Sequence, residues 1–477
     1  MLFRSTAEDV VWSFQATIAN DPSKSFYYKH VTKAEQTGPN EVTFTFDGPG
    51  NRELPMIVGQ LVVLPKHWWE GTGPDGKKRS IAESTLEPPL GSGPYRIARF
   101  EAGRYVVLER VENWWAADLP TMVGSYNFDQ IRFDYYREET GEFEAFKADG
   151  IDVRLENSAK NWATSYDFPA RVQGRVVLDK IPQLGMGQMS GFVPNLRREK
   201  FQDPRVRQAL AYTFDFEETN RTMFFGQYER PTSYFHPTEL ASSGLPQGRE
   251  LEILKEAETA GPIPPEVYTK TYAPPTTPDP TAFRANLREA LRLFGEAGWV
   301  QKGGKLVSAK TGEPFRIEFL GYSPAIERVV VRWRENLAKI GIDLTVRTVD
   351  PSQYTNRIRG RDYDMILHNW AESMSPGNEQ TEYWGSASAD REGSQNLAGI
   401  KNPAIDAIIH HLLFSKDRAE LVAATHALDR VLLWNHYAVP AWTLSALRMA
   451  RWDRYSHRSE EHTSELQSQF RISYAVF

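Results

Sequence analysis

The sequence predicts an α/β protein, because strands and helices alternate through its second half. Strands are expected at Phe315–Leu320, Ile342–Val349 and Tyr363–Leu367, with amphipathic helices at 324–340 and 352–359 between them. Alternation of this kind builds a parallel sheet whose two faces are covered by helices.

Helix starts support this fold class, because several carry an N-cap residue followed by proline at the first helical position. Asp203-Pro204, Ser323-Pro324 and Asn402-Pro403 have this form. Further amphipathic helices are expected at 281–297 and 417–435. The proline-rich residues between 260 and 280 have no helical or strand period, so they are predicted to be a loop.

The first half is predicted to be mainly strands joined by tight turns. Residues 41–64 are expected to form strand, turn and strand, with Leu61–Leu64 as the second strand. A strand pair at 95–98 and 105–108 turns at Gly103, and another strand is expected at 131–135. A short helix at Glu142–Ala148 follows.

Composition limits the possible classes of protein. The chain has 477 residues, enough for two or three domains of ~150 residues. Fifty-six Lys and Arg residues against 62 Asp and Glu residues give a net charge of −6, so we expect no nucleic-acid partner. Cysteine is absent, which excludes disulfides, thiolate nucleophiles and zinc sites with cysteine ligands. No apolar run approaches the ~18 residues that span a bilayer.

Both ends differ in character from the rest. Residues 1–5 have no apolar core of a signal peptide, and Thr6 at once begins a capped helix. Residues 458–477 begin as a polar stretch without a period that resembles translated sequencing-adapter read-through. We therefore expect residues 1–5 and 458–477 to be non-native. We also expect this chain to be a natural protein truncated at both ends.

Enzyme motifs are poorly matched. Gly91-Ser92-Gly93 lacks the spacing of a nucleophile elbow, and Lys310-Thr311-Gly312 has no partner motif of a β-lactamase. His410-His411 is not part of an HExxH motif, so a solvated pair is the better interpretation and no metal or cofactor is expected. A glycosidase needs only two facing carboxylates, which the sequence neither identifies nor excludes.

Segments along the chain resemble family 5 of the extracytoplasmic solute-binding proteins, which serve ABC importers of peptides and nickel. The segments are Thr6–Phe14, Gly91–Ile97, Ile131–Thr140 with Ala145–Asp152, Phe201–Leu210, Glu296–Trp299 and Ile340–Ile342. Each is a weak match, but their order is that of the family, and together they span residues 6–455. Ser375–Gln380 and Asn396–Lys401 look most like the YejA branch, which is linked to oligopeptides and microcin C.

The resemblance implies a type II periplasmic-binding-protein fold, with two α/β lobes, hinge crossings and a small accessory lobe. It implies a partial accessory lobe at 6–85, a partial first lobe at 90–190 plus 439–455, and a second lobe at 191–438. The chain would cross between lobes near 181–193 and 439–444.

The resemblance also implies that the loop after the strand at 363–367 lines the ligand cleft. Oligopeptide receptors of the family carry an Asp three residues after Trp370 that pairs with the α-amino group of the peptide. This chain has Ser373 there, so Glu372, Asn378 and Glu379 are alternative acceptors.

Aromatic and methionine side chains are further candidates for ligand contacts. Trp370, Tyr383 and Trp384 could form flat walls of the cleft or pack within the lobe. Met186 and Met189 could give adaptable contacts at the first crossing, unless that glycine-rich strand is only a bulge in the sheet.

Together these observations predict a non-enzymatic, monomeric periplasmic protein that captures peptides or peptide-like ligands and delivers them to an ABC permease in the inner membrane. Two alternatives stay open: a glycoside-active enzyme, and the same fold with a non-peptide ligand.

Overall fold

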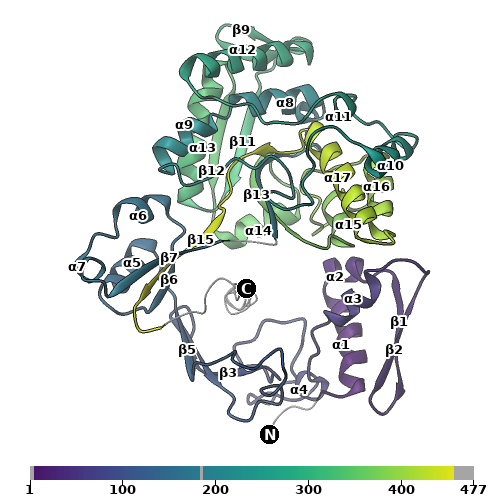
Figure 1. Cartoon of the computed structure of the whole chain (residues 1–477), viewed down its shortest axis with the longest axis vertical. Helices are drawn as coiled ribbons and strands as arrows, with labels where there is room; N and C mark the ends of the chain where they lie inside the picture. The colour runs from purple at the N-terminus through teal and green to yellow at the C-terminus, as the bar shows by residue number, and fades with distance from the viewer. Residues whose placement is uncertain (1–4, 183–185, 456–477) are drawn as a thin grey trace.

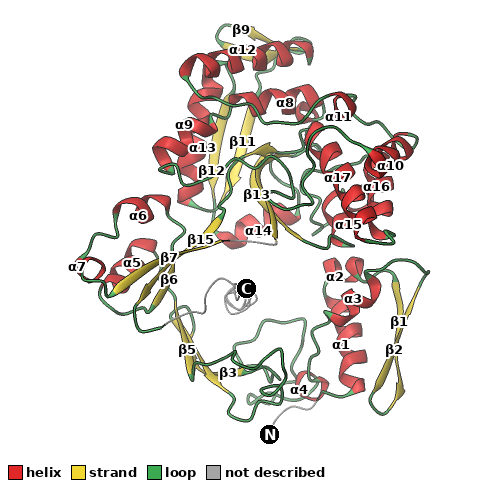
Figure 2. Ribbon diagram, in the orientation of Figure 1, coloured by secondary structure: helices red, strands yellow, loops and turns green. Residues whose placement is uncertain are grey.

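The computed structural model describes residues 5–182 and 186–455, so the expected non-native residues 1–4 and 458–477 lie outside the described part. The chain forms four groups of elements arranged in a ring (Figure 1). Three groups combine helices and strands, whereas β3–β5 are accompanied mainly by loops (Figure 2).

The N-terminal unit begins with the capped helix that the sequence predicts. Thr6 accepts a hydrogen bond from the Asp9 backbone N–H, and the Asp9 carboxylate accepts one from the Thr6 N–H. The unit packs around Phe14, Leu54 and Ile57. Its elements are α1 (Ala7–Asn20), α2 (Pro22–Tyr27), β1 (Val31–Gly38), β2 (Glu41–Phe46), α3 (Leu54–Gly59) and α4 (Lys66–Trp69).

The strand expected at Leu61–Leu64 is wrong. β2 pairs instead with β1, which precedes it, and residues 61–64 run as irregular chain after α3. Leu64 is held there because its N–H donates to the Ser13 side chain and its carbonyl accepts from the same hydroxyl. An apolar run of four residues does not by itself specify a strand.

Two small sheets follow. β3 (Tyr95–Glu101), β4 (Tyr105–Arg110) and β5 (Gln130–Asp134) form an antiparallel meander, and Gly103 takes the left-handed conformation at the predicted turn. The first body is the sheet β6 (Val153–Leu155), β15 (Ala446–Trp452) and β7 (Val176–Pro182), in the order β6-β15-β7. Its helices are α5 (Glu139–Lys147), α6 (Ala159–Thr164) and α7 (Pro169–Val172).

The second body contains the predicted parallel strands. Its sheet has the order β12-β11-β13-β8-β14, and β11 (Arg316–Gly321) is parallel to both β12 (Asp343–Thr348) and β13 (Met365–Ser373). β8 (Met186–Pro194) and β14 (Val439–Pro440) are antiparallel additions. The strands β9 (Trp299–Lys302) and β10 (Lys305–Ser308) form a separate hairpin.

Helices cover both faces of this sheet, as predicted, and the core on one side surrounds Phe192 and Trp333. Burial of such a side chain contributes about 1.5–3 kcal/mol. The helices are α8 (Pro204–Thr213), α9 (Phe216–Met223), α10 (Gly248–Glu258), α11 (Glu266–Thr269), α12 (Pro280–Glu296), α13 (Pro324–Lys339), α14 (Pro351–Arg359), α15 (Glu379–Trp384), α16 (Pro403–Leu413) and α17 (Arg418–Trp434), with short 3₁₀ turns at Glu199–Phe201 and Ser386–Ser388. The loop expected between 260 and 280 is partly wrong, because α11 lies within it and buries Val267.

The chain passes twice between the two bodies. β7 belongs to the sheet of the first body and β8 to that of the second. The chain returns from β14 in the second body to β15 in the first. Both passages therefore lie close to β8, which β14 contacts directly.

Candidate ligand-binding site

The two passages between the bodies meet at a small pocket. Residues from the start of β8, from the segment 443–445 before β15, and from the His236-Pro237 turn line it together. Sites between two bodies of a protein commonly bind small ligands, because motion of the bodies can enclose them.

β8 and β13 form a two-stranded ribbon next to this pocket, and its register assigns each side chain to a face. Trp370 lies opposite Met189, and Glu372 lies opposite Gly187. Since residues directly opposite in an antiparallel pair share a face, these side chains all point to one side. Trp370, Glu372 and Met189 are each at most 2% exposed, so this is the core face of the ribbon.

The other face of the ribbon is open and polar. Asn369 lies opposite Ser190, and Ser373 lies opposite Met186. Asn369 and Ser373 are exposed, and the Ser190 Oγ lies 3.1 Å from Asn369 Oδ1. Met186 is half-buried and also lines the pocket. Ligand contacts predicted at Ser373 and Met186 therefore have accessible side chains.

β13 also has an unpaired edge. Within residues 5–182 and 186–455, β11 pairs with β13 only at Phe319 and Met365, and no other strand pairs with residues 366–373 on that side. An unpaired edge presents backbone N–H and C=O groups that an extended chain can bind.

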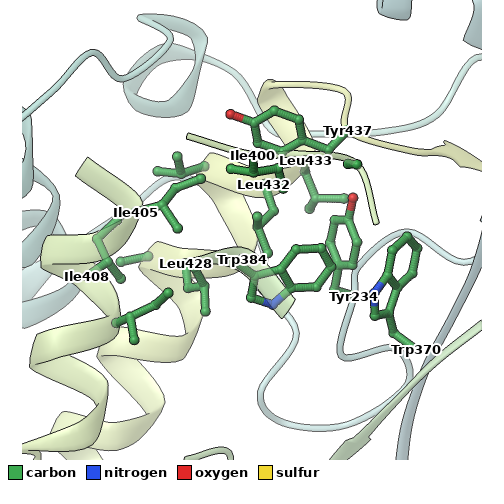
Figure 3. Packing of buried hydrophobic residues seen from close by; sticks show 14 of the residues in the cluster. Tyr234, Trp370, Trp384, Ile400, Ile405, Ile408, Leu428, Leu432, Leu433 and Tyr437 are labelled. Carbon is green, nitrogen blue, oxygen red and sulfur yellow. The ribbon is translucent and has the colours of Figure 1, made fainter. Parts of the chain in front are cut away.

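The predicted aromatic walls lie inside the second body. The ring centroid of Tyr234 is 5.4 Å from that of Trp370 and 4.9 Å from that of Trp384, and the two indoles are 5.2 Å apart (Figure 3). Trp384 is 1% exposed, whereas Tyr383 is half-buried. Trp370 and Trp384 thus pack in the lobe in this conformation, which was the alternative interpretation of these residues.

Glu372 is buried in a hydrogen-bond network behind the ribbon. Its Oε2 accepts a hydrogen bond of 2.6 Å from Gln380 Nε2, and Gln380 Oε1 accepts one from Trp384 Nε1. Burial, together with the nearby Glu379 carboxylate, raises the pKa of Glu372 well above its ordinary value. The protonated form of this carboxyl group is therefore favoured over the charged form.

Glu379 and Asn378 lie at the start of α15. Glu379 accepts a hydrogen bond of 2.7 Å from the Gly377 backbone N–H, and burial raises its pKa. Asn378 Oδ1 accepts a hydrogen bond of 3.3 Å from Asn51 Nδ2 of the N-terminal unit. Both candidate acceptors therefore participate in contacts within the protein.

Sequence reasoning missed the polar residues of the open face and the pocket, namely Gln188, Ser190, His236, Asn369 and Thr443. The Thr443 hydroxyl donates to Gln188 Oε1, so these two residues link the two passages. Alternation along 186–194 was an available signal, because the polar Gln188 and Ser190 alternate there with Gly187, Met189 and Gly191.

In the part of the chain that the structure describes, no group of three or more Asp, Glu, His or Cys residues could hold a metal ion. No helix of these residues is long and apolar enough to cross a membrane. Around the ribbon, burial lowers the pKa of His368 to about 4, so this histidine is neutral.

Comparison with solved structures identifies the class of fold. The oligopeptide-binding protein AppA of Bacillus subtilis, in complex with a nonapeptide, superposes with a TM-score of 0.72 at 18% identity, over 97% of this chain and 83% of that chain. NikZ of Campylobacter jejuni, in complex with Ni(L-His), gives a TM-score of 0.68 at 16% identity, over 94% and 79%. The predicted type II periplasmic-binding-protein fold is confirmed.

Sequence comparison identifies the family. The family model described as "Bacterial extracellular solute-binding proteins, family 5 Middle" matches residues 4–392. The protein belongs to family 5 of the bacterial extracellular solute-binding proteins. It is 52% identical over 450 residues to the "Probable peptide-binding protein YejA" of Agrobacterium fabrum, and the match covers 94% of this chain and 73% of the relative. YejA of Agrobacterium fabrum and AppA are both named as binding proteins.

Proposed function

We propose that this protein captures peptides or peptide-like ligands outside the cytoplasm and delivers them to an ABC importer. The observation that carries the proposal is the unpaired edge of β13 beside an open polar face. An extended peptide binds such an edge through main-chain hydrogen bonds, which accept many side-chain sequences. The relative named YejA is a probable peptide-binding protein, and AppA holds a nonapeptide.

The proposed mechanism is closure of two lobes over the ligand without a chemical step. We assign residues 90–190 with 439–455 to the first lobe, residues 191–438 to the second and residues 6–85 to the accessory lobe, except that β8 and β14 belong to the sheet of the second body. Rotation about the two passages encloses the peptide, and ligand shifts the open–closed equilibrium by its preference for the closed state. The closed form, as a periplasmic monomer, docks on the inner-membrane permease.

Isothermal titration calorimetry with a defined peptide pool tests the proposal. We expect heat of binding from peptides, and none from nickel–histidine complexes or free oligosaccharides. Heat from those compounds with none from any peptide would contradict it. Turnover of chromogenic glycosides would favour the glycoside-active alternative.

Asn369→Ala tests the position of the site. This side chain lies on the open face and supports little of the fold, so peptide affinity should fall about three- to tenfold while stability is unchanged. Asn40→Ala, at the exposed turn between β1 and β2, is the matched control and should change neither. Equal peptide affinity of the two variants would show that the binding site does not lie on the open face of the ribbon.

A further inference from the structure

The N-terminal unit contacts the second body along one seam, where Arg52 makes the first contact. Arg52 Nη2 donates 2.9 Å to the Pro376 carbonyl and its Nη1 donates 3.1 Å to Ser375 Oγ. The same guanidinium pairs with Glu53 of its own unit. Asn51 adds the hydrogen bond to Asn378. These residues hold the chain before α3 against the chain before α15.

A second contact is made by Arg391, in the chain that follows α15. The Arg391 guanidinium carbon lies 4.2 Å from the ring centroid of Phe26 in α2, and Arg391 Nη1 donates 3.4 Å to the Pro22 carbonyl. Glu382 of α15 pairs with Arg391 and orients it. Figure 1 shows α2 next to α15, and two separate contacts join the unit to the second body.

Gly377 allows the two sides to approach each other. A Cβ atom at this position would lie 2.7 Å from Glu53 Cγ, closer than packed atoms approach. Glu53 is fixed by Arg52, and its own N–H donates to the Asn51 side chain. A side chain at residue 377 would therefore push the two sides apart.

The seam combines polar contacts with the Phe26 ring, and it is separate from the hydrophobic cores. Among the described residues, each hydrophobic cluster lies within one unit or body, and the core of the N-terminal unit does not include residues of the second body. Separation of the seam would therefore expose polar groups to water without opening a core. Polar interfaces of this kind between parts of a chain permit relative motion.

We propose that the seam is a clasp, which engages when the protein closes and must release before ligand leaves. Arg52 and Arg391 make its two contacts. A side chain introduced at Gly377 would separate them. This inference rests on the proposed function, because it assigns the clasp a role in retaining the peptide. It adds a contact outside the ligand site that sets how long the closed state lasts.

Gly377→Ala in the full chain tests the clasp, with Gly295→Ala as the matched control. Gly295 lies in α12, where an added Cβ meets nothing within 4 Å. Because the chain has no cysteine, Asn40→Cys and Lys255→Cys place spin labels on exposed positions of the N-terminal unit and the second body. Without ligand, double electron–electron resonance should show a longer and broader distribution of label–label distances for Gly377→Ala than for the labelled parent. Gly295→Ala should give the distribution of the parent.

Peptide release provides the second measurement. Stopped-flow displacement should show release about tenfold faster from Gly377→Ala than from the control, because most interface changes act on the dissociation rate. Arg52→Gln removes one of the two contacts without a steric clash and should shift both measurements in the same direction. This second variant keeps the test valid if Gly377→Ala folds poorly.

Unchanged distances in both variants would overturn the clasp, and so would altered distances with unchanged release. If the unaltered protein binds no peptide while the distances still shift, the proposed function fails. The seam between the N-terminal unit and the second body would then be a contact that plays no part in retaining peptide.

Discussion

At the scale of single residues, the site is organised by which side chains are buried. Glu372 follows an exposed residue and precedes another, yet it is 1% exposed because it points into the second body. Its neighbours Glu379 and, across the seam, Glu53 also have pKa values raised by burial. This part of the protein thus concentrates acids that favour the protonated form.

Glu372→Gln should stabilise the protein above neutral pH. A carboxyl group with a raised pKa in the folded state binds its proton more tightly there than in the unfolded chain. Its contribution to the free energy of unfolding is therefore complete below the ordinary pKa of 4.5 and is lost as pH rises toward the raised value. The loss is about 1.4 kcal/mol per pH unit within that window. Urea unfolding at pH 5 and pH 8 should show a smaller decrease for the variant than for the unaltered protein.

The exposed Glu83→Gln is the control for this measurement, since Glu83 lies in a surface loop. It should leave the difference between the two pH values unchanged. A Glu372→Gln protein that loses as much stability between pH 5 and pH 8 as the parent would show that Glu372 is not protonated in the folded state.

At the scale of elements, the ribbon of β8 and β13 separates a core face from an open face. Gly187 and Gly191 are required on the core face, because a Cβ at residue 187 would lie 2.8 Å from Phe235 Cα and one at residue 191 would lie 2.8 Å from Ala438 Cβ. Both neighbouring segments thus pack directly on the β8 backbone. The ligand contacts predicted from the sequence are accordingly divided between the two faces of the ribbon.

Gly187→Ala should therefore destabilise the second body by about 1–3 kcal/mol, the usual cost of overpacking. The clash is with backbone, so a rotamer change does not relieve it. The midpoint of urea unfolding, measured beside Gly295→Ala, would report the loss. A variant as stable as that control would show that the backbone at Phe235 can shift away from β8 at little cost in stability.

The open face also makes a prediction about ligand ends. Ser373 occupies the position at which the resemblance to oligopeptide receptors implies an acidic residue, and Glu372 points to the core face. Acetylated peptides should therefore bind within about threefold of the same peptides with a free amine, because no charge-assisted hydrogen bond is lost. Competition calorimetry with matched pairs of peptides measures this ratio, and a hundredfold preference for the free amine would reveal an acidic anchor.

At the scale of the whole molecule, two passages beside one pocket connect the bodies, and a polar seam joins the N-terminal unit to the second body. The cores lie within the separate parts, so the connections between the parts can change while each part stays folded. This arrangement suits a protein that encloses its ligand by moving rigid parts.

A peptide ligand should raise the thermal midpoint, since it binds the folded protein and not the unfolded chain. At a concentration of one hundred times Kd, the stabilisation is about 2.7 kcal/mol. Tryptophan fluorescence during a thermal ramp measures the shift, with a nickel–histidine complex as the comparison ligand. A shift with the nickel complex alone would favour the non-peptide alternative.

Local chemistry by itself determined much of this protein. The cap at Thr6, the Asp203-Pro204 start and the alternation through 315–367 specify helices and strands through interactions between near neighbours, and the ordered motifs identified the family. Only the tertiary structure decided which face of β8 and β13 is open. The two-residue period separates Trp370 and Glu372 from Asn369 and Ser373, but α15 and the 234–237 segment, distant in sequence, determine which pair is covered.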